Sequence, residues 1–206
     1  MMLRKHFGVI GWTMGVTLLL LIGCKGATSP VQFYTLAVPD APAEAASTAK
    51  TSDSIAVGVG PLELPKMLDR PQIVTRGTGN TLQMDEFHRW GGSLQEDILR
   101  SLAENLSGLL RSNRVMTYPW ADFFQPDYRI YLVFQRFDGR LGESLVLNAT
   151  WAVTDARGRE ALAVRRSVIR EPLAAADYES LVAASSRVLE TLSLQIAEEL
   201  ERLQAR

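Results

Sequence analysis

Apolar and polar side chains alternate along the C-terminal half of the chain, most regularly between residues 145 and 153. The apolar set on one side is Leu145, Leu147, Ala149, Trp151 and Val153. A period of two is typical of a half-buried β-strand. Runs rich in β-branched and aromatic residues predict further strands at 31–38, 55–62, 72–76, 81–85, 115–118, 128–137 and 162–168. Residues 77–80, Gly-Thr-Gly-Asn, suit a hairpin turn between two of these strands.

Two segments change to the helical period. Ser93 and Glu96 form a capping box, and apolar residues follow at helical spacing from Leu94 to Leu109. Asp177 can cap a final helix with an apolar stripe from Leu181 to Leu203. The sequence therefore predicts an α+β fold, in which two amphipathic helices pack on a mostly antiparallel sheet within one domain, residues 31–206.

The N-terminus has the pattern of a bacterial lipoprotein signal. Two cations precede an apolar run at residues 7–22, and Gly23 precedes Cys24, the single cysteine of the chain. The run is short for a membrane span, which needs about 20 apolar residues. We expect residues 1–23 to be removed by cleavage between Gly23 and Cys24, and Cys24 to carry diacylglycerol and an N-acyl chain. A free, buried cysteine in an ordinary signal-anchor helix is the alternative.

We expect the mature protein to be located at the periplasmic face of the outer membrane. In organisms with two membranes, aspartate after the lipidated cysteine commonly retains a lipoprotein at the inner membrane, and here the residue is Lys25. Residues 24–30 would form a short lipidated tether. Residues 39–53 lack large apolar side chains and are expected to form a flexible loop.

Composition excludes several function classes. The 206-residue chain has a net charge of −1, and loss of the leader removes two cations, which argues against nucleic acid as a partner. After cleavage His88 is the one histidine left, and no G-x-S-x-G element is present. Asp85 and Glu86 are more simply a solvated strand end than a general acid and base. We expect no catalytic site, no metal site and no cofactor apart from the lipid on Cys24.

Residues 64–71 admit two interpretations. In the structural one, Asp69 bonds the backbone of a turn, Arg70 pairs with an acid and Pro71 fixes an extended entry to the next strand. In the functional one, the segment docks a partner subunit, because arginine among apolar residues is favoured at interface centres. The candidate docking residues are Leu64, Pro65, Leu68, Asp69, Arg70, Pro71 and Trp90.

A second candidate contact is the aromatic loop at residues 119–124, which contains Trp120, Phe123 and Phe124. If it is exposed, it would suit a membrane or a partner. It could equally close the end of the sheet.

The stretch from Leu64 to Val74, with Arg89-Trp90 and Ser93-Leu94, resembles the ABC-type transport auxiliary lipoprotein family, which includes the PqiC-like proteins. Four further features match this family in order and spacing: the lipobox Leu21-Ile22-Gly23-Cys24, the Phe33–Leu36 stretch, Trp151 and the last helix. The resemblance implies a non-enzymatic subunit of a lipid transport system that docks or receives a periplasmic conduit at the outer membrane. Implied partners are an MCE-domain periplasmic protein, an inner-membrane permease and further copies of the chain. The alternatives are a lipoprotein activator of a cell-wall synthase and a periplasmic lipid chaperone.

Overall fold

The computed structural model describes residues 30–37 and 55–205. The expected signal peptide, Cys24 with its tether up to residue 29, and the expected loop at 39–53 lie outside these residues. The chain divides into Met1–Pro30 and Val31–Arg206, and the second unit carries the fold. Its elements are β1 (Gln32–Tyr34), β2 (Val57–Glu63), the 3₁₀ turn η2 (Lys66–Leu68), β3 (Gln72–Arg76), β4 (Leu82–Trp90), α2 (Leu94–Leu110), β5 (Val115–Thr117), β6 (Tyr128–Gly139), β7 (Ser144–Thr154), β8 (Ala161–Pro172) and α3 (Tyr178–Gln204).

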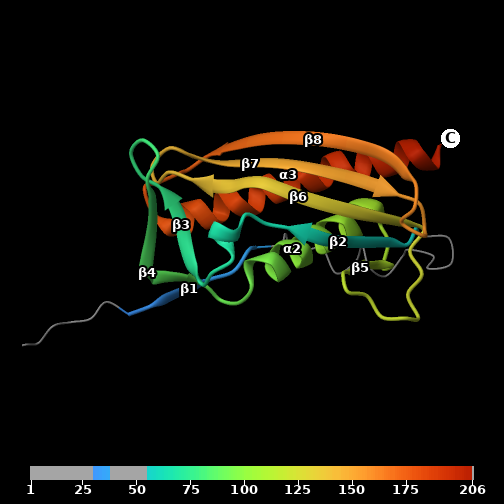
Figure 1. The fold of residues 1–206 in the computed structure, drawn as a ribbon, viewed down its shortest axis with the longest axis horizontal. Helices are drawn as coiled ribbons and strands as arrows, with labels where there is room; N and C mark the ends of the chain where they lie inside the picture. Colours follow the sequence, from blue (N-terminus) through green and yellow to red (C-terminus); the bar gives the residue numbers. More distant parts are fainter. Residues whose placement is uncertain (1–29, 38–54, 206) are drawn as a thin grey trace, which may run out of the picture. The chain divides into compact units, whose positions relative to one another are not determined.

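The larger sheet has five strands in the order β5-β2-β6-β7-β8 (Figure 1). Strands β6, β7 and β8 form an antiparallel meander, as the alternating sequence predicts. Strand β2 runs parallel to both β5 and β6, so the sheet is mixed rather than mostly antiparallel. The reason is the connection: the chain leaves β2, builds a second sheet and α2, and only then returns, and such a crossover joins parallel strands.

The smaller sheet has the order β1-β4-β3. Strands β3 and β4 form the predicted hairpin, closed by Gly77 N–H donating to Thr81 O at 3.0 Å. Gly79 has a φ of 61°, the left-handed conformation that the turn requires. Strand β1 pairs with β4 in parallel, with Phe33 opposite Arg89 and Tyr34 opposite Trp90.

Both predicted helices are confirmed. The Ser93 side chain accepts a hydrogen bond from Glu96 N at the start of α2, and the Asp177 side chain accepts from Ser180 N at the start of α3. The helices contact each other and the large sheet, and they cover one of its faces (Figure 1). The core lies between these layers. Within the part of the chain that is described, no helix combines the length and apolar character needed to cross a membrane.

The other face of the large sheet carries exposed apolar side chains. Val133 on β6 and Val164 and Val168 on β8 are 39%, 57% and 65% exposed. Towards one end of this sheet, β3 approaches β6, and a buried carboxylate joins them. Asp138 accepts from Arg76 Nε at 2.6 Å and from Arg136 Nε at 2.8 Å, while its own side chain is 1% exposed.

Candidate docking site

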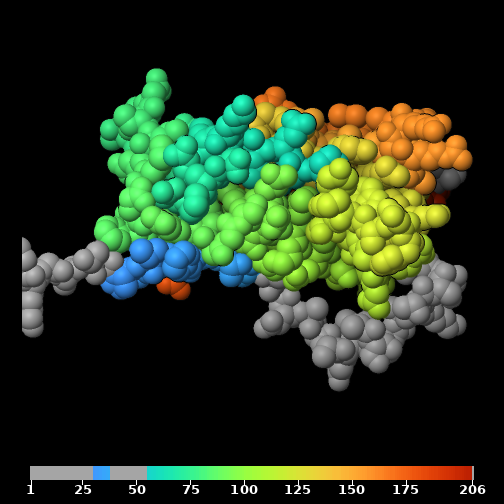
Figure 2. Space-filling view, turned by 60° about the horizontal axis from the view of Figure 1, so that its bottom comes forward, coloured from blue at the N-terminus to red at the C-terminus, as the bar shows by residue number. Residues whose placement is uncertain are grey.

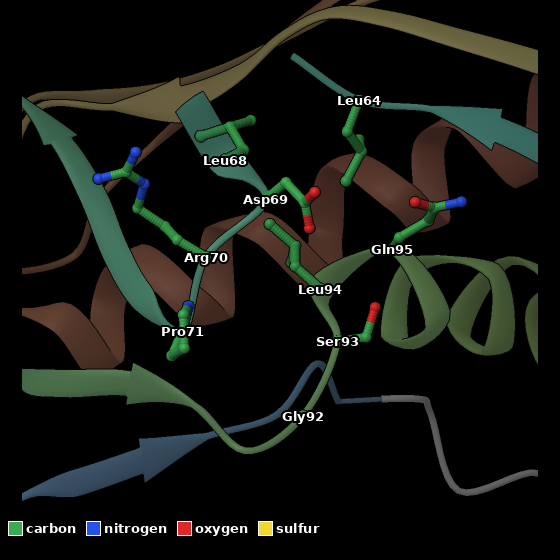
Figure 3. A pocket seen from close by; sticks show the side chains of 9 residues that line it. All are labelled: Leu64, Leu68, Asp69, Arg70, Pro71, Gly92, Ser93, Leu94 and Gln95. Carbon is green, nitrogen blue, oxygen red and sulfur yellow. The ribbon is translucent and has the colours of Figure 1, made fainter. Parts of the chain in front are cut away.

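Two segments far apart in sequence enclose a pocket of about 330 Å³ (Figure 3). One wall is the connection from β2 to β3, and the other is the start of α2. Five of the seven expected docking residues line it: Leu64, Leu68, Asp69, Arg70 and Pro71. The facing wall is formed by Gly92, Ser93, Leu94 and Gln95. The segment identified in the sequence is therefore one side of a real concavity.

The first wall is held at both ends. Leu68 N donates to Pro65 O at 2.8 Å, which closes the short 3₁₀ turn, and the Leu68 side chain is only 3% exposed. Pro71 O accepts from Trp90 N at 2.8 Å, which fixes the entry to β3 against β4. The wall is thus a rigid edge rather than a free loop.

The two charged residues of this wall are exposed, and neither forms an ion pair within the described part of the chain. Among residues 30–37 and 55–205, no ion pair involves Asp69 or Arg70, and no hydrogen bond is made by the Asp69 carboxylate. Arg70 Nη1 instead lies 2.6 Å from Met84 Sδ on β4. In Figure 3 the Arg70 side chain points away from Leu64 and Leu94, whereas Asp69 lies between them. The described residues thus show neither the turn bond of the structural interpretation for Asp69 nor its acid partner for Arg70, while Pro71 does lead directly into β3.

Pro65 and Trp90 do not line the pocket. Trp90 is 7% exposed and belongs to the hydrophobic core, and Pro65 is half-buried beside η2. Both residues hold the first wall through their backbones, since Pro65 O accepts from Leu68 N and Trp90 N donates to Pro71 O.

His88 is a packing residue, as its isolation in the sequence suggests. Its Nδ1 lies 2.7 Å from the Tyr34 hydroxyl, and its ring stacks on Tyr178 with centroids 4.0 Å apart. Burial raises the pKa of both tyrosines. Glu86 pairs with Arg89 at 2.8 Å on the exposed strand.

The sequence analysis missed a clamp on the N-terminal strand. Asp97 on α2 accepts from Leu36 N at 2.7 Å, and Arg100 Nη2 donates to Leu36 O at 2.9 Å. Ala37 N donates to Ser186 Oγ on α3 at 3.0 Å. The hydrogen bond to Asp97 raises the pKa of Arg100. In sequence, Asp97 is an ordinary acid in the first turn of a helix, and no local pattern links it to a residue 61 positions away.

The aromatic loop divides between the two expected roles. Trp120 packs over Gly58 of β2, with Tyr118 at its edge (centroids 5.5 Å apart) and the Arg129 guanidinium 5.3 Å from its centroid. Phe123, in contrast, is 81% exposed. The loop therefore closes the sheet with Trp120 and leaves Phe123 in solvent.

Comparison with known proteins gives a family match over residues 34–197, to the ABC-type transport auxiliary lipoprotein component. Among curated proteins none matches. A crystal structure described only as an uncharacterized protein is similar, with a TM-score of 0.66 at 15% identity, covering 83% of this chain and 99% of that one. A Xanthomonas campestris protein of the family DUF330 has a TM-score of 0.59 at 16% identity, covering 81% and 92%. These two structures support the fold. On the family match, this chain belongs to the ABC-type transport auxiliary lipoprotein components.

Proposed function

We propose that this protein is a membrane-anchored, non-enzymatic periplasmic subunit of an MCE-type, ABC-linked lipid transport system. It would dock or receive the periplasmic conduit at the outer membrane, with an MCE-domain protein and an inner-membrane permease as partners. Membership of the transport auxiliary family supports the general role. The observation that carries the docking role is the pocket between residues 64–71 and the start of α2, whose Asp69 carboxylate has no partner among the described residues.

The anchor would be the acylated Cys24, with residues 1–23 removed. Two or three acyl chains make attachment effectively permanent. Cys24→Ala should leave an uncleaved, unlipidated precursor that is missing from the outer-membrane fraction. The measurement is membrane fractionation with intact-mass analysis, and recovery of the variant in the outer membrane would contradict the anchor.

The pocket suits a protein partner. Leu64, Leu68 and Leu94 give it an apolar lining, and Asp69 offers a carboxylate with no partner inside the described domain. Binding residues that are held rigidly lose little entropy on association, and both walls here are fixed by backbone hydrogen bonds. A partner that inserts an apolar side chain next to a cation would match this site.

The test is photo-crosslinking in envelopes. A photoreactive residue at Gln95, on the pocket wall, should capture an MCE-domain protein, whereas one at Glu190, exposed on α3, should not. Asp69→Lys should reduce the capture at Gln95 about tenfold, the effect of losing about 1.4 kcal/mol, without changing the thermal stability of the domain. Recovery of a cell-wall synthase would favour the activator alternative, and capture of lipid alone would favour the chaperone.

We also propose that several copies assemble. The face of the large sheet opposite the helices supports this, because Val164 and Val168 are both exposed on this side of its last strand, β8. Sedimentation of the protein should show a mass above that of one chain, and Val164→Lys/Val168→Lys should lower it. A wild-type protein that stays monomeric at all concentrations would contradict the assembly.

A further inference from the structure

The outer side of the small sheet exposes large apolar residues that the core does not use. Phe33 is 68% exposed, Met84 46%, Val31 41% and Phe87 38%. We call these four residues the Phe33 face. They come from β4 and from the chain around β1, and Figure 2 shows these segments, blue and green, at one end of the described domain.

Strand register places Phe33 and Met84 on one side of the small sheet, whereas Phe87 lies where the pairing of β3 with β4 shifts and is assigned to the face by its exposure. Phe33 is opposite Arg89, and Arg89 is opposite Gln72 of β3. Val74, two residues beyond Gln72 and so on the same side, is opposite Met84. The reverse side is taken by the Tyr34, His88 and Tyr178 stack against α3, so Phe33 and Met84 are directed away from the core.

The position of this face relative to the anchor is constrained. Only six residues lie between Cys24 and Val31, so their Cα atoms can be at most about 25 Å apart. The chain that follows is fixed to the domain by the Asp97–Leu36 and Ser186–Ala37 hydrogen bonds and by pairing of β1 with β4. Chain length therefore sets an upper limit on how far the acylated residue can lie from β1, and this inference depends on the proposed lipidation of Cys24.

We propose that the Phe33 face rests on the surface of the bilayer that holds the acyl chains. A tether this short keeps the face at a high effective concentration against the headgroups, so a small apolar area is sufficient for contact. Phenylalanine with neighbouring arginine is a composition suited to the membrane interface. The exposed Arg70 guanidinium contacts Met84 through Nη1 and forms no ion pair with the described residues, so its other N–H groups are available to a lipid phosphate. The pocket next to this sheet would then present its partner close to the membrane.

The test uses single labelled cysteines, because lipid consumes the one natural cysteine. Phe33→Cys, Phe87→Cys, Phe123→Cys and Glu190→Cys are each prepared as the lipidated protein and labelled with the fluorophore NBD. The labelled proteins are reconstituted in vesicles of phosphatidylethanolamine and phosphatidylglycerol. We expect iodide to quench the labels at Phe33 and Phe87 at least threefold less than the label at Glu190, and doxyl-labelled lipid to quench them more. Phe123, in the loop at the other end of the large sheet, should behave like Glu190.

The possible results distinguish a failure of the proposed membrane contact from a failure of the proposed lipid anchor. Labelled protein that fails to float with the vesicles would overturn the anchor and the face together. Protein that floats but exposes Phe33 and Phe87 to iodide as fully as Glu190 would overturn the face alone. Protection of Phe123 instead would show that the opposite end meets the membrane. Protection of Phe33 in unlipidated protein without vesicles would show that a second copy covers the face. Either of these last two results would also overturn the proposal.

Discussion

Gly58 is the residue at which the aromatic loop meets the large sheet. A Cβ at this position would lie 2.7 Å from Trp120 Cζ3, closer than real contacts allow. Gly58→Ala should therefore displace the ring and lower the free energy of unfolding by about 1–3 kcal/mol, the usual cost of overpacking. Urea unfolding measures this change. In a Trp120→Ala background the same substitution should cost far less, and an equal cost in both backgrounds would show that the ring is not what Gly58 accommodates.

The sequence indicates part of this contact. Glycines on one face of the expected strand at 55–62 predict the close approach of a backbone or a bulky side chain, and Trp120 makes that approach to Gly58. The identity of the side chain could not be predicted, because the β3–β4 hairpin, α2 and β5 separate β2 from the aromatic loop along the chain. Asp69 and Arg70 illustrate the same limit of sequence-based prediction, because their spacing in the sequence does not reveal whether either charge has a partner in the fold.

Helix α3 begins at the N-cap Asp177, whose carboxylate contributes to the stability of the fold in its ionised form. Two hydrogen bonds from Ser180 lower the pKa of Asp177. The bond from the Ser180 backbone N–H has the larger effect, and the bond from its side chain the smaller. A lowered folded-state pKa contributes stability that is fully present above the unfolded value of about 3.9 and is lost as pH falls through the folded value. Asp177→Asn removes the charge and keeps an acceptor, so its stability deficit should shrink as pH is lowered through this range. Chemical unfolding from pH 7 to 3 tests this, and a constant deficit would contradict it.

The link between the two sheets depends on Asp138. Its carboxylate accepts from Arg76 and Arg136, and its removal would leave both guanidinium groups without their shared partner. Breaking a buried pair usually costs 3–5 kcal/mol. We expect roughly 2–3 kcal/mol for Asp138→Ala, because the Arg76 and Arg136 side chains are 36% and 33% exposed. Glu143→Ala, which breaks an exposed pair with Arg140, is the matched control and should cost under about 1 kcal/mol. Equal costs in urea unfolding would refute the role of Asp138.

At the scale of elements, prediction succeeded where the signal is local. Both helices carry a cap and an apolar stripe within their own sequence, and the β3–β4 hairpin carries its turn residues. Parallel pairing has no such local signature. Whether two strands pair in parallel depends on the path of the chain that connects them through the folded domain. The parallel neighbours of β2 and the separate sheet that includes β1 were therefore not predicted.

For the whole domain, the sequence located one wall of the pocket but not the concavity itself. Residues 64–71 stand out by their composition, whereas the opposing wall at Gly92–Gln95 indicates a helix start and part of the family resemblance, with no sign that it faces residues 64–71. A pocket exists because two elements are brought together by packing, and that packing is a property of the folded chain. The clamp on the N-terminal strand is of the same kind, and it couples the expected anchor to the rest of the domain.

Asp97 makes this coupling testable. Asp97→Ala removes the acceptor of the Leu36 amide, and a hydrogen bond to a charged group contributes about 1.5–3 kcal/mol. The amide protons of residues 35–37 should then exchange roughly tenfold to a hundredfold faster, while those of β6 to β8 keep their rates. Glu104→Ala is the control, because it removes the other carboxylate partner of Arg100 and leaves the Leu36 bonds intact. In vesicles, an NBD label at Phe33 should lose protection from iodide in the Asp97 variant although the protein still floats. Unchanged exchange and quenching would mean that the Asp97 hydrogen bond does not hold the strand, and that its pairing with β4 and the bonds to Arg100 and Ser186 suffice.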